Sequence, residues 1–128
     1  MHFINDLFSV TGKTVEATSG NFTLRLNASH PVYRGHFPNN PITPGVCSLE
    51  IIKELIELDF SRCGHLSEVE SIKFLSFINP LATPEITADL KILKTSSGIW
   101  RVRGMLSADR KPVVKIVMQF GINASQSL

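Results

Sequence analysis

One segment with a helical pattern stands among several segments with a strand pattern, and this combination limits the fold more than any other feature. Residues 44–59 place apolar side chains around well over half of a helix, so this helix is predicted to be buried on most sides. The helical pattern does not recur. Segments with an extended or alternating pattern lie at 14–18, 21–28, 68–78, 86–92, 99–106 and 113–120.

Short turn-forming stretches join the predicted strands. Ser19 and Gly20 are predicted to form a hairpin turn, and residues 96–98 and 109–112 turn the chain between the later strands. Short connections between successive strands favour antiparallel pairing, since parallel strands need long crossovers.

The expected fold is therefore one α+β domain over residues 1–128, in which a curved antiparallel sheet wraps one long central helix. A monomer of this kind would leave apolar strand residues such as Val114 or Val117 exposed. Association through a sheet edge is a reasonable expectation.

Size and composition are those of an ordinary globular domain. The 128 residues are 43% hydrophobic and 19% charged, and the thirteen basic residues are scattered with a net charge of only +2, so a nucleic acid partner is not expected. No stretch is long enough to span a membrane, and residues 1–10 do not resemble a signal peptide, which favours the cytoplasm. Cys47 and Cys63 lack the spacing of a zinc site and are expected to be free thiols.

A proline-rich loop leads into the predicted helix. It reads GHFPNNPITPGVCSLE from Gly35 to Glu50. Each of its three prolines fixes its own φ and restricts the residue before it, so His36 lies on a loop with few conformations. Thr43 followed by Pro44 is typical of a helix N-terminus, with threonine as the cap and proline as the first helical residue.

Gly45 indicates a ligand site at this helix start. Glycine in a helix interior costs about 0.5–1 kcal/mol relative to alanine, so its presence calls for a reason such as the close approach of a ligand. Its N–H group, unpaired in the first turn, can point at a carbonyl oxygen or an anion. His36 lies before this position and Glu50 lies in the second turn after it.

Both titratable residues also have ordinary explanations. A histidine in a loop is most often only solvated or hydrogen-bonded. Glu50 forms a stripe with Lys53, Glu54 and Glu57 that is typical of a solvated helix face with some ion pairing. The sequence contains no pattern of metal ligands, no phosphate-binding loop and no serine-hydrolase elbow.

The run HFPNNPITPGVCSLE resembles the motif HFPGxPxxPGVLxxE of the β-hydroxyacyl-acyl carrier protein dehydratases, with matching spacing throughout. The resemblance implies the hot-dog fold, a sheet wrapped around one long helix. It also places His36 on the catalytic histidine of the family, Glu50 on its catalytic acid, and Gly45 on the glycine whose N–H binds the thioester carbonyl. Residues 72–74 and 100–120 are similar to later strands of the family.

The chain departs from the family pattern at three places. Asn39 replaces the usual glycine, although asparagine tolerates a left-handed backbone. Glu54 stands where the dehydratases usually carry glutamine, and this second carboxylate is expected to raise the pKa of Glu50 or to alter the pocket. The opening LLPHRxPFLLVD of the family has no counterpart in Met1 to Glu16, so the acyl-chain specificity stays open.

The activity implied by the resemblance is reversible dehydration of a (3R)-3-hydroxyacyl thioester on acyl carrier protein to the trans-2-enoyl thioester, with no cofactor. His36 would take a proton from C2, the Gly45 N–H would stabilise the charge on the thioester oxygen, and Glu50 would protonate the leaving hydroxyl. In this family the histidine and the acid of one site come from different subunits. A homodimer is therefore expected, and a trimer of dimers occurs among relatives.

The resemblance also implies residues that bind the substrate and its carrier. Phe37, Pro44, Gly45 and Phe74 are expected to contact the substrate, and the acyl chain is expected to lie in a tunnel near Phe74, Leu75 and Phe77. The basic residues Arg34, Lys73, Arg101 and Arg103 are candidates for docking the acidic carrier protein, although charged strand residues are more often simply solvated.

Two other functions stay open on the same fold. A hot-dog thioesterase would use a carboxylate to bring in water, and typically lacks the histidine-proline loop. A non-catalytic acyl-binding partner subunit would not need His36, Gly45 and Glu50 together. The unusual helix sequence and the altered opening also favour a specialised lipid route, such as aryl polyene or other polyketide-like lipids, over housekeeping fatty-acid synthesis.

Overall fold

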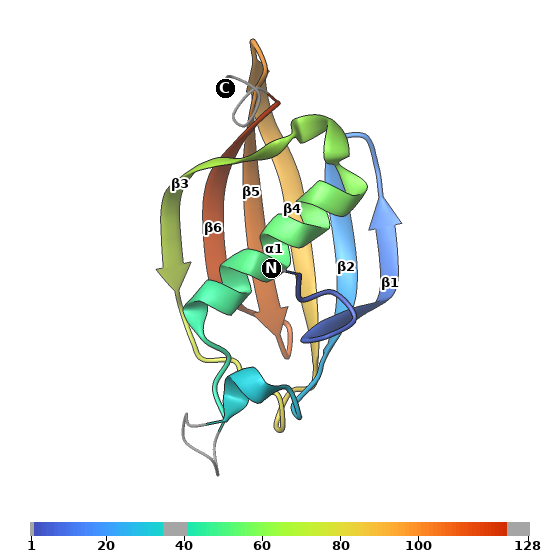
Figure 1. Ribbon diagram of the computed structural model, residues 1–128, viewed down its shortest axis with the longest axis vertical. Helices are drawn as coiled ribbons and strands as arrows, with labels where there is room; N and C mark the ends of the chain where they lie inside the picture. The colour runs from blue at the N-terminus through green and yellow to red at the C-terminus, as the bar shows by residue number, and fades with distance from the viewer. Residues whose placement is uncertain (1, 35–40, 123–128) are drawn as a thin grey trace.

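The computed structural model describes residues 2–34 and 41–122, and in this part of the chain one α-helix lies across the concave face of a six-stranded sheet (Figure 1). The prediction of one helix wrapped by a curved antiparallel sheet is confirmed. The elements are β1 (Phe8–Val15), β2 (Ser19–Leu26), the 3-10 helix η1 (Pro31–Tyr33), α1 (Gly45–Asp59), the 3-10 helix η2 (Ser61–Cys63), β3 (His65–Phe74), β4 (Glu85–Ser96), β5 (Ile99–Ala108) and β6 (Lys111–Gly121).

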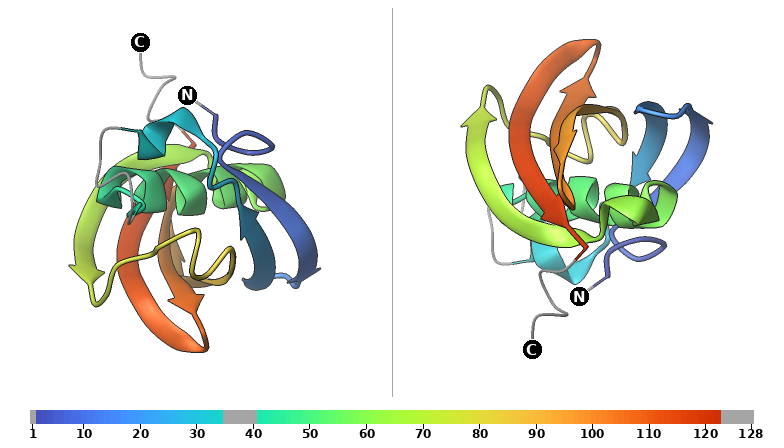
Figure 2. Two further views of the ribbon diagram at one scale, coloured as in Figure 1. Left: turned by 90° about the horizontal axis from the view of Figure 1, so that it is seen from below. Right: turned by 90° about the horizontal axis from the view of Figure 1, so that it is seen from above.

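The strands follow the order β1-β2-β4-β5-β6-β3, and each neighbouring pair is antiparallel. Figure 2 shows the strands curving around α1. The expectation that successive strands form hairpins is wrong for β3 and β4, because residues 75–84 carry the chain from the edge of the sheet to its interior. The strand that follows the helix, β3, is thus one of the two edges of the sheet.

The predicted turn at Ser19 and Gly20 is also wrong, since both residues belong to β2 and the turn lies at residues 16–18. Gly20 pairs with Val15 on one side and with Leu90 on the other. A Cβ atom on Gly20 would lie only 2.8 Å from the Phe22 ring. The glycine therefore makes room for an aromatic side chain in the core and does not form a turn.

The core lies between α1 and the concave face of the sheet. From the helix it receives Ile51, Ile52, Leu55 and Ile56, all of them 0% exposed. Gly104 on β5 allows the helix to approach closely, because a Cβ atom there would lie 2.7 Å from Ile52 Cγ2. Burying one such aliphatic side chain contributes about 1.5–3 kcal/mol, so this face holds the helix on the sheet.

Three expectations about exposure need correction. Val46 and Leu58 were predicted to belong to the buried surface of the helix, but they are 71% and 55% exposed because the sheet covers only one side of α1. Val114, expected to be exposed, is only 2% exposed. It faces the concave side, beside the start of the helix, and its β6 backbone pairs with Phe74 of β3.

The N-terminal segment covers the outer side of the helix. Phe3 and Leu7 are buried, and the Leu7 N–H donates a hydrogen bond of 2.8 Å to the Phe3 carbonyl. Figure 1 shows this segment passing in front of α1.

Cys47 and Cys63 are buried free thiols, as predicted. None of the helices in the described ranges is both long and apolar enough to cross a membrane.

Candidate active site

Helix α1 begins one residue later than predicted. Pro44 is its N-cap and Gly45 is the first helical residue, and no side chain of the described chain caps the helix. Thr43 instead shares a 2.9 Å hydrogen bond with the Tyr33 hydroxyl, and its N–H donates to the Ile78 carbonyl at 2.8 Å. The threonine therefore fixes the segment that enters the helix, and the N–H of Gly45 remains in the first turn without an acceptor inside the helix.

A pocket of about 380 Å³ opens at this helix start. Its lining includes Pro44, Gly45 and Ser48 at the helix start, Phe74 and Phe77 at and after the end of β3, and Val114 of β6. The structure thus brings together three of the predicted substrate-binding residues, namely Pro44, Gly45 and Phe74. Ser48 was not predicted, although its position three residues after Gly45 places it on the same helix face.

The Phe74 ring lies directly against Gly45. A Cβ atom on Gly45 would lie 2.7 Å from Phe74 Cζ. The predicted acyl tunnel is not closed in a single chain, because Phe74, Leu75 and Phe77 are 57%, 51% and 77% exposed. These residues end or follow the edge strand β3, so one side of the pocket has no neighbouring strand of the same chain.

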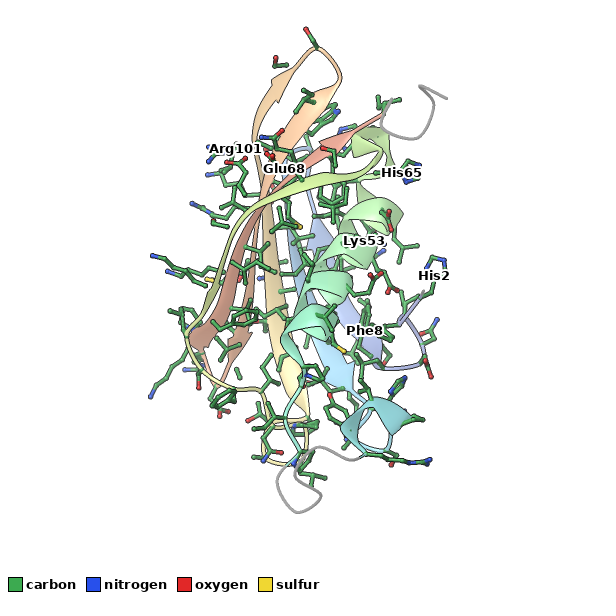
Figure 3. All side chains as sticks on the ribbon, turned by 60° about the vertical axis from the view of Figure 1, so that its left-hand side comes forward. His2, Phe8, Lys53, His65, Glu68 and Arg101 are labelled. Atoms are coloured by element: carbon green, nitrogen blue, oxygen red, sulfur yellow. The ribbon has the colours of Figure 1, made fainter. Side chains whose placement is uncertain are left out.

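Glu50 does not line this pocket. It lies five residues after Gly45, which corresponds to about 140° around an α-helix. Its carboxylate forms an ion pair with Lys53, with Oε2 and Nζ 3.3 Å apart, and its side chain is 17% exposed. Lys53 lies on the side of α1 turned away from the sheet (Figure 3). A single chain therefore does not present Gly45 and Glu50 to one cavity.

Glu54 is buried, which corrects the prediction of a solvated stripe at this position. It is 2% exposed, and both of its carboxylate oxygens accept the Phe3 N–H, at 2.8 and 2.7 Å. Its Oε1 also accepts the Ile4 N–H at 2.9 Å. Sequence periodicity could not reveal this role, because the donors come from a segment about fifty positions earlier in the chain.

The environment of Glu50 favours its protonated form. Burial is the largest cause that raises its pKa, and the neighbouring Glu54 carboxyl raises it further, whereas Lys53 acts in the opposite direction. The prediction that Glu54 raises the pKa of Glu50 thus agrees in direction with the structure. A carboxylic acid with a raised pKa is suited to donating a proton near neutral pH.

His36, Phe37 and Asn39 lie outside the described residues, so the predictions made for them stand as predictions. The two flanks of that segment are joined at the helix start by the bond between Tyr33 and Thr43. In the described ranges, no group of three or more His, Cys, Asp or Glu side chains could hold a metal ion.

The candidate carrier-docking residues do not form one patch with the pocket. Arg101 is exposed and binds Glu70 at 2.9 Å, and Figure 3 shows it across the sheet from Lys53. Arg34, Lys73 and Arg103 are also exposed. Of these, Lys73 directly precedes Phe74 in β3, but its side chain faces the opposite side of the sheet from Phe74.

The family model described as ApeI-like, ApeI dehydratase, matches residues 12–114 of this chain. A 3-hydroxyacyl-(acyl-carrier-protein) dehydratase FabZ from Ruminiclostridium cellulolyticum is 24% identical in an alignment of 125 residues that covers 90% of this chain and 87% of that relative. The family model covers the helix start and all residues that line the pocket.

Two of the solved structures that match this chain illustrate the shared fold. The dehydratase heterocomplex ApeI:P from Xenorhabdus doucetiae has a TM-score of 0.67 at 20% identity, covering 88% of this chain and 96% of the other. A mutant thioesterase from Pseudomonas aeruginosa has a TM-score of 0.64 at 14% identity, covering 89% and 79%. The chain therefore has the hot-dog fold, as predicted.

Proposed function

The chain belongs to the ApeI-like dehydratase family, and we propose that it converts (3R)-3-hydroxyacyl thioesters, carried by acyl carrier protein, to trans-2-enoyl thioesters. The observation that carries this proposal is the pocket at the start of α1. There Gly45, whose N–H group lies at the positive end of the helix dipole, lines a space with largely apolar walls. Such a site suits a polar thioester group attached to an apolar chain.

In the proposed reaction, neutral His36 removes a proton from C2 of the substrate. The Gly45 N–H stabilises the negative charge that builds up on the thioester oxygen. Glu50 in its protonated form then gives a proton to the C3 hydroxyl, which leaves as water while the C2–C3 double bond forms. The thioester itself acidifies C2, so these three groups suffice for the proton transfers.

The complete site in this proposal contains two chains. Since Glu50 does not line the pocket of its own chain, the acid at each pocket is supplied by Glu50 of the partner subunit. The edge strand β3 supports such an assembly, because its edge is unpaired in the single chain and Val69 and Phe74 on it are 37% and 57% exposed. The second subunit is proposed to be another copy of this chain.

The acyl group is proposed to come from a specialised lipid route, and its carrier protein to dock near the mouth of the pocket. Lys73 is kept as a candidate for this contact because it is exposed and directly precedes Phe74, although its side chain faces the opposite side of the sheet from Phe74. An acidic carrier would be attracted by exposed basic residues such as Lys73 and Arg34.

The test is turnover of a (3R)-3-hydroxyacyl group on acyl carrier protein, followed by mass spectrometry of the acyl group. The expected product has lost one water and keeps its thioester bond. His36→Ala is expected to abolish turnover while the circular dichroism spectrum and the molecular mass of the assembly stay unchanged. Full activity of His36→Ala would remove the assignment.

The same assay separates the dehydratase from the other functions considered. Release of the free acid without any enoyl product would show a thioesterase. In that case Glu50 on the central helix would be the carboxylate that brings in water. Binding of the acyl carrier without either product would show a non-catalytic acyl-binding subunit. The similarity to solved thioesterases concerns the fold alone, so it does not favour hydrolysis.

A further inference from the structure

Ser48 is a polar residue in the wall of the pocket that the proposed mechanism does not use. It is 1% exposed, lies three residues after Gly45 in α1 and lines the same pocket. Residues three apart lie on one face of a helix, and helical side chains point back toward the N-terminus. The Ser48 hydroxyl is therefore directed toward the turn that contains Gly45.

The hydroxyl group of Ser48 has no hydrogen-bond partner among the described residues. A helical serine often bonds to the carbonyl four residues earlier. That carbonyl, of Pro44, already accepts the N–H groups of Cys47 at 2.9 Å and Ser48 at 3.3 Å. In the described chain, every polar side-chain atom that is fully shielded from solvent has a hydrogen-bond partner. The Ser48 oxygen has no partner in that part of the chain, so it must retain part of the small solvent-accessible area of this residue. Because Ser48 lines the pocket, this accessible oxygen lies on the pocket wall.

We propose that Ser48 is a second hydrogen-bond donor to the thioester oxygen, acting beside the N–H of Gly45. This inference rests on the proposed dehydration. The surrounding walls come largely from apolar residues such as Phe74, Phe77 and Val114, so the Ser48 hydroxyl is left available to a ligand that enters the pocket. The thioester oxygen is the acceptor for this hydroxyl, and it becomes a stronger one as negative charge develops on it during proton removal at C2.

The first test compares two variants with one control. Ser48→Ala removes the hydroxyl, and Ser48→Cys fills the same space with a thiol, which is a weak donor. Both are expected to lower kcat by about 10²- to 10³-fold with little change in KM, as for the loss of one donor to an oxyanion. Ser107→Ala removes another buried hydroxyl, on β5 away from the pocket, and is expected to retain full activity.

These variants separate hydrogen bonding from packing. If Ser48→Cys restores the rate lost in Ser48→Ala, the residue acts by filling space and the proposal is overturned. Wild-type rates in Ser48→Ala overturn it as well. Thermal denaturation followed by circular dichroism shows whether each variant is folded, and alanine is the most favourable residue in a helix.

The second test does not depend on turnover. Hexanoyl-pantetheine labelled with ¹³C at the thioester carbonyl cannot be dehydrated, because it has no 3-hydroxyl group. Its carbonyl stretching frequency, measured by infrared difference spectroscopy, is expected to be lower when bound to the wild type than when bound to Ser48→Ala. Equal frequencies, or no binding to the wild type, would overturn the role of Ser48. A shift without any dehydration would instead leave Ser48 as a carbonyl donor and refute the dehydratase.

Discussion

Two glutamates one turn apart on α1 differ in environment. Glu54 is nearly inaccessible and is held by backbone N–H groups of Phe3 and Ile4. Glu50 has a partly exposed side chain with Lys53 at 3.3 Å. Because Glu54 is fixed in place by these hydrogen bonds, it keeps a carboxyl group close to Glu50. The substitution of the usual glutamine of the family by Glu54 thus acts on the proposed acid.

Glu54→Gln is expected to move the pH dependence of kcat. Glu50 donates a proton only when it is protonated, so activity declines as the pH rises through its pKa. Burial raises that pKa and Glu54 raises it further, and the amide removes the second cause. The decline should therefore begin at lower pH in Glu54→Gln than in the wild type. Glu57→Gln, which alters another carboxylate of the same helix, should leave the profile unchanged, and an equal shift in both variants would contradict the specific role of Glu54.

At the scale of secondary structure, local patterns in the sequence predicted which elements form but not which elements meet. The periodicity of residues 44–59 predicted α1 to within one residue at its start. Gly20 was misread as a turn because its reason, contact with the Phe22 ring, is a packing effect. The position of β3 beside β6, and the burial of Glu54, depend on contacts between distant segments, so neither could follow from spacing along the chain.

Docking of the N-terminal segment on α1 gives a second prediction. Glu54→Ala leaves the N–H groups of Phe3 and Ile4 without their acceptor, so the free energy of unfolding is expected to fall by about 1–3 kcal/mol in urea titrations. Hydrogen exchange should accelerate at the Phe3 and Ile4 amides and stay slow at Ile52 in the core of the helix. The matched variant Glu57→Ala should change neither quantity. Unchanged exchange at Phe3 in Glu54→Ala would show that other contacts hold the segment.

At the scale of the whole molecule, the sheet edge formed by β3 has no neighbouring strand in the single chain and lies beside the pocket. Strand β3 ends at Phe74, which forms a wall of the pocket, and the exposed Phe77 follows it. The family motif could be recognised from the sequence. The five-residue spacing already separates Gly45 from Glu50 by about 140° around the helix. That the pocket at the helix start lacks Glu50 depends on the packing of β3 and β6 beside α1, which the sequence does not show. This incompleteness of the single chain is the physical reason to expect a shared site.

Complementation between two inactive variants tests the shared site. His36→Ala and Glu50→Gln are each expected to be inactive as homodimers. Co-expressed with different affinity tags and purified as a heterodimer, they should recover about half of the wild-type activity, because a two-fold dimer has two equivalent sites and only one of them keeps both residues. The reason is that this one site combines the intact His36 of one chain with the intact Glu50 of the other.

The matched control for that experiment is a heterodimer of wild type with the double variant carrying both substitutions. In it each site lacks one of the two residues, so it should be inactive if the sites are shared between chains. If each chain instead held a complete site of its own, this control would keep about half of the activity and the heterodimer of single variants would have none. The two heterodimers thus give opposite results under the two arrangements, and native mass spectrometry confirms their composition before the rates are compared.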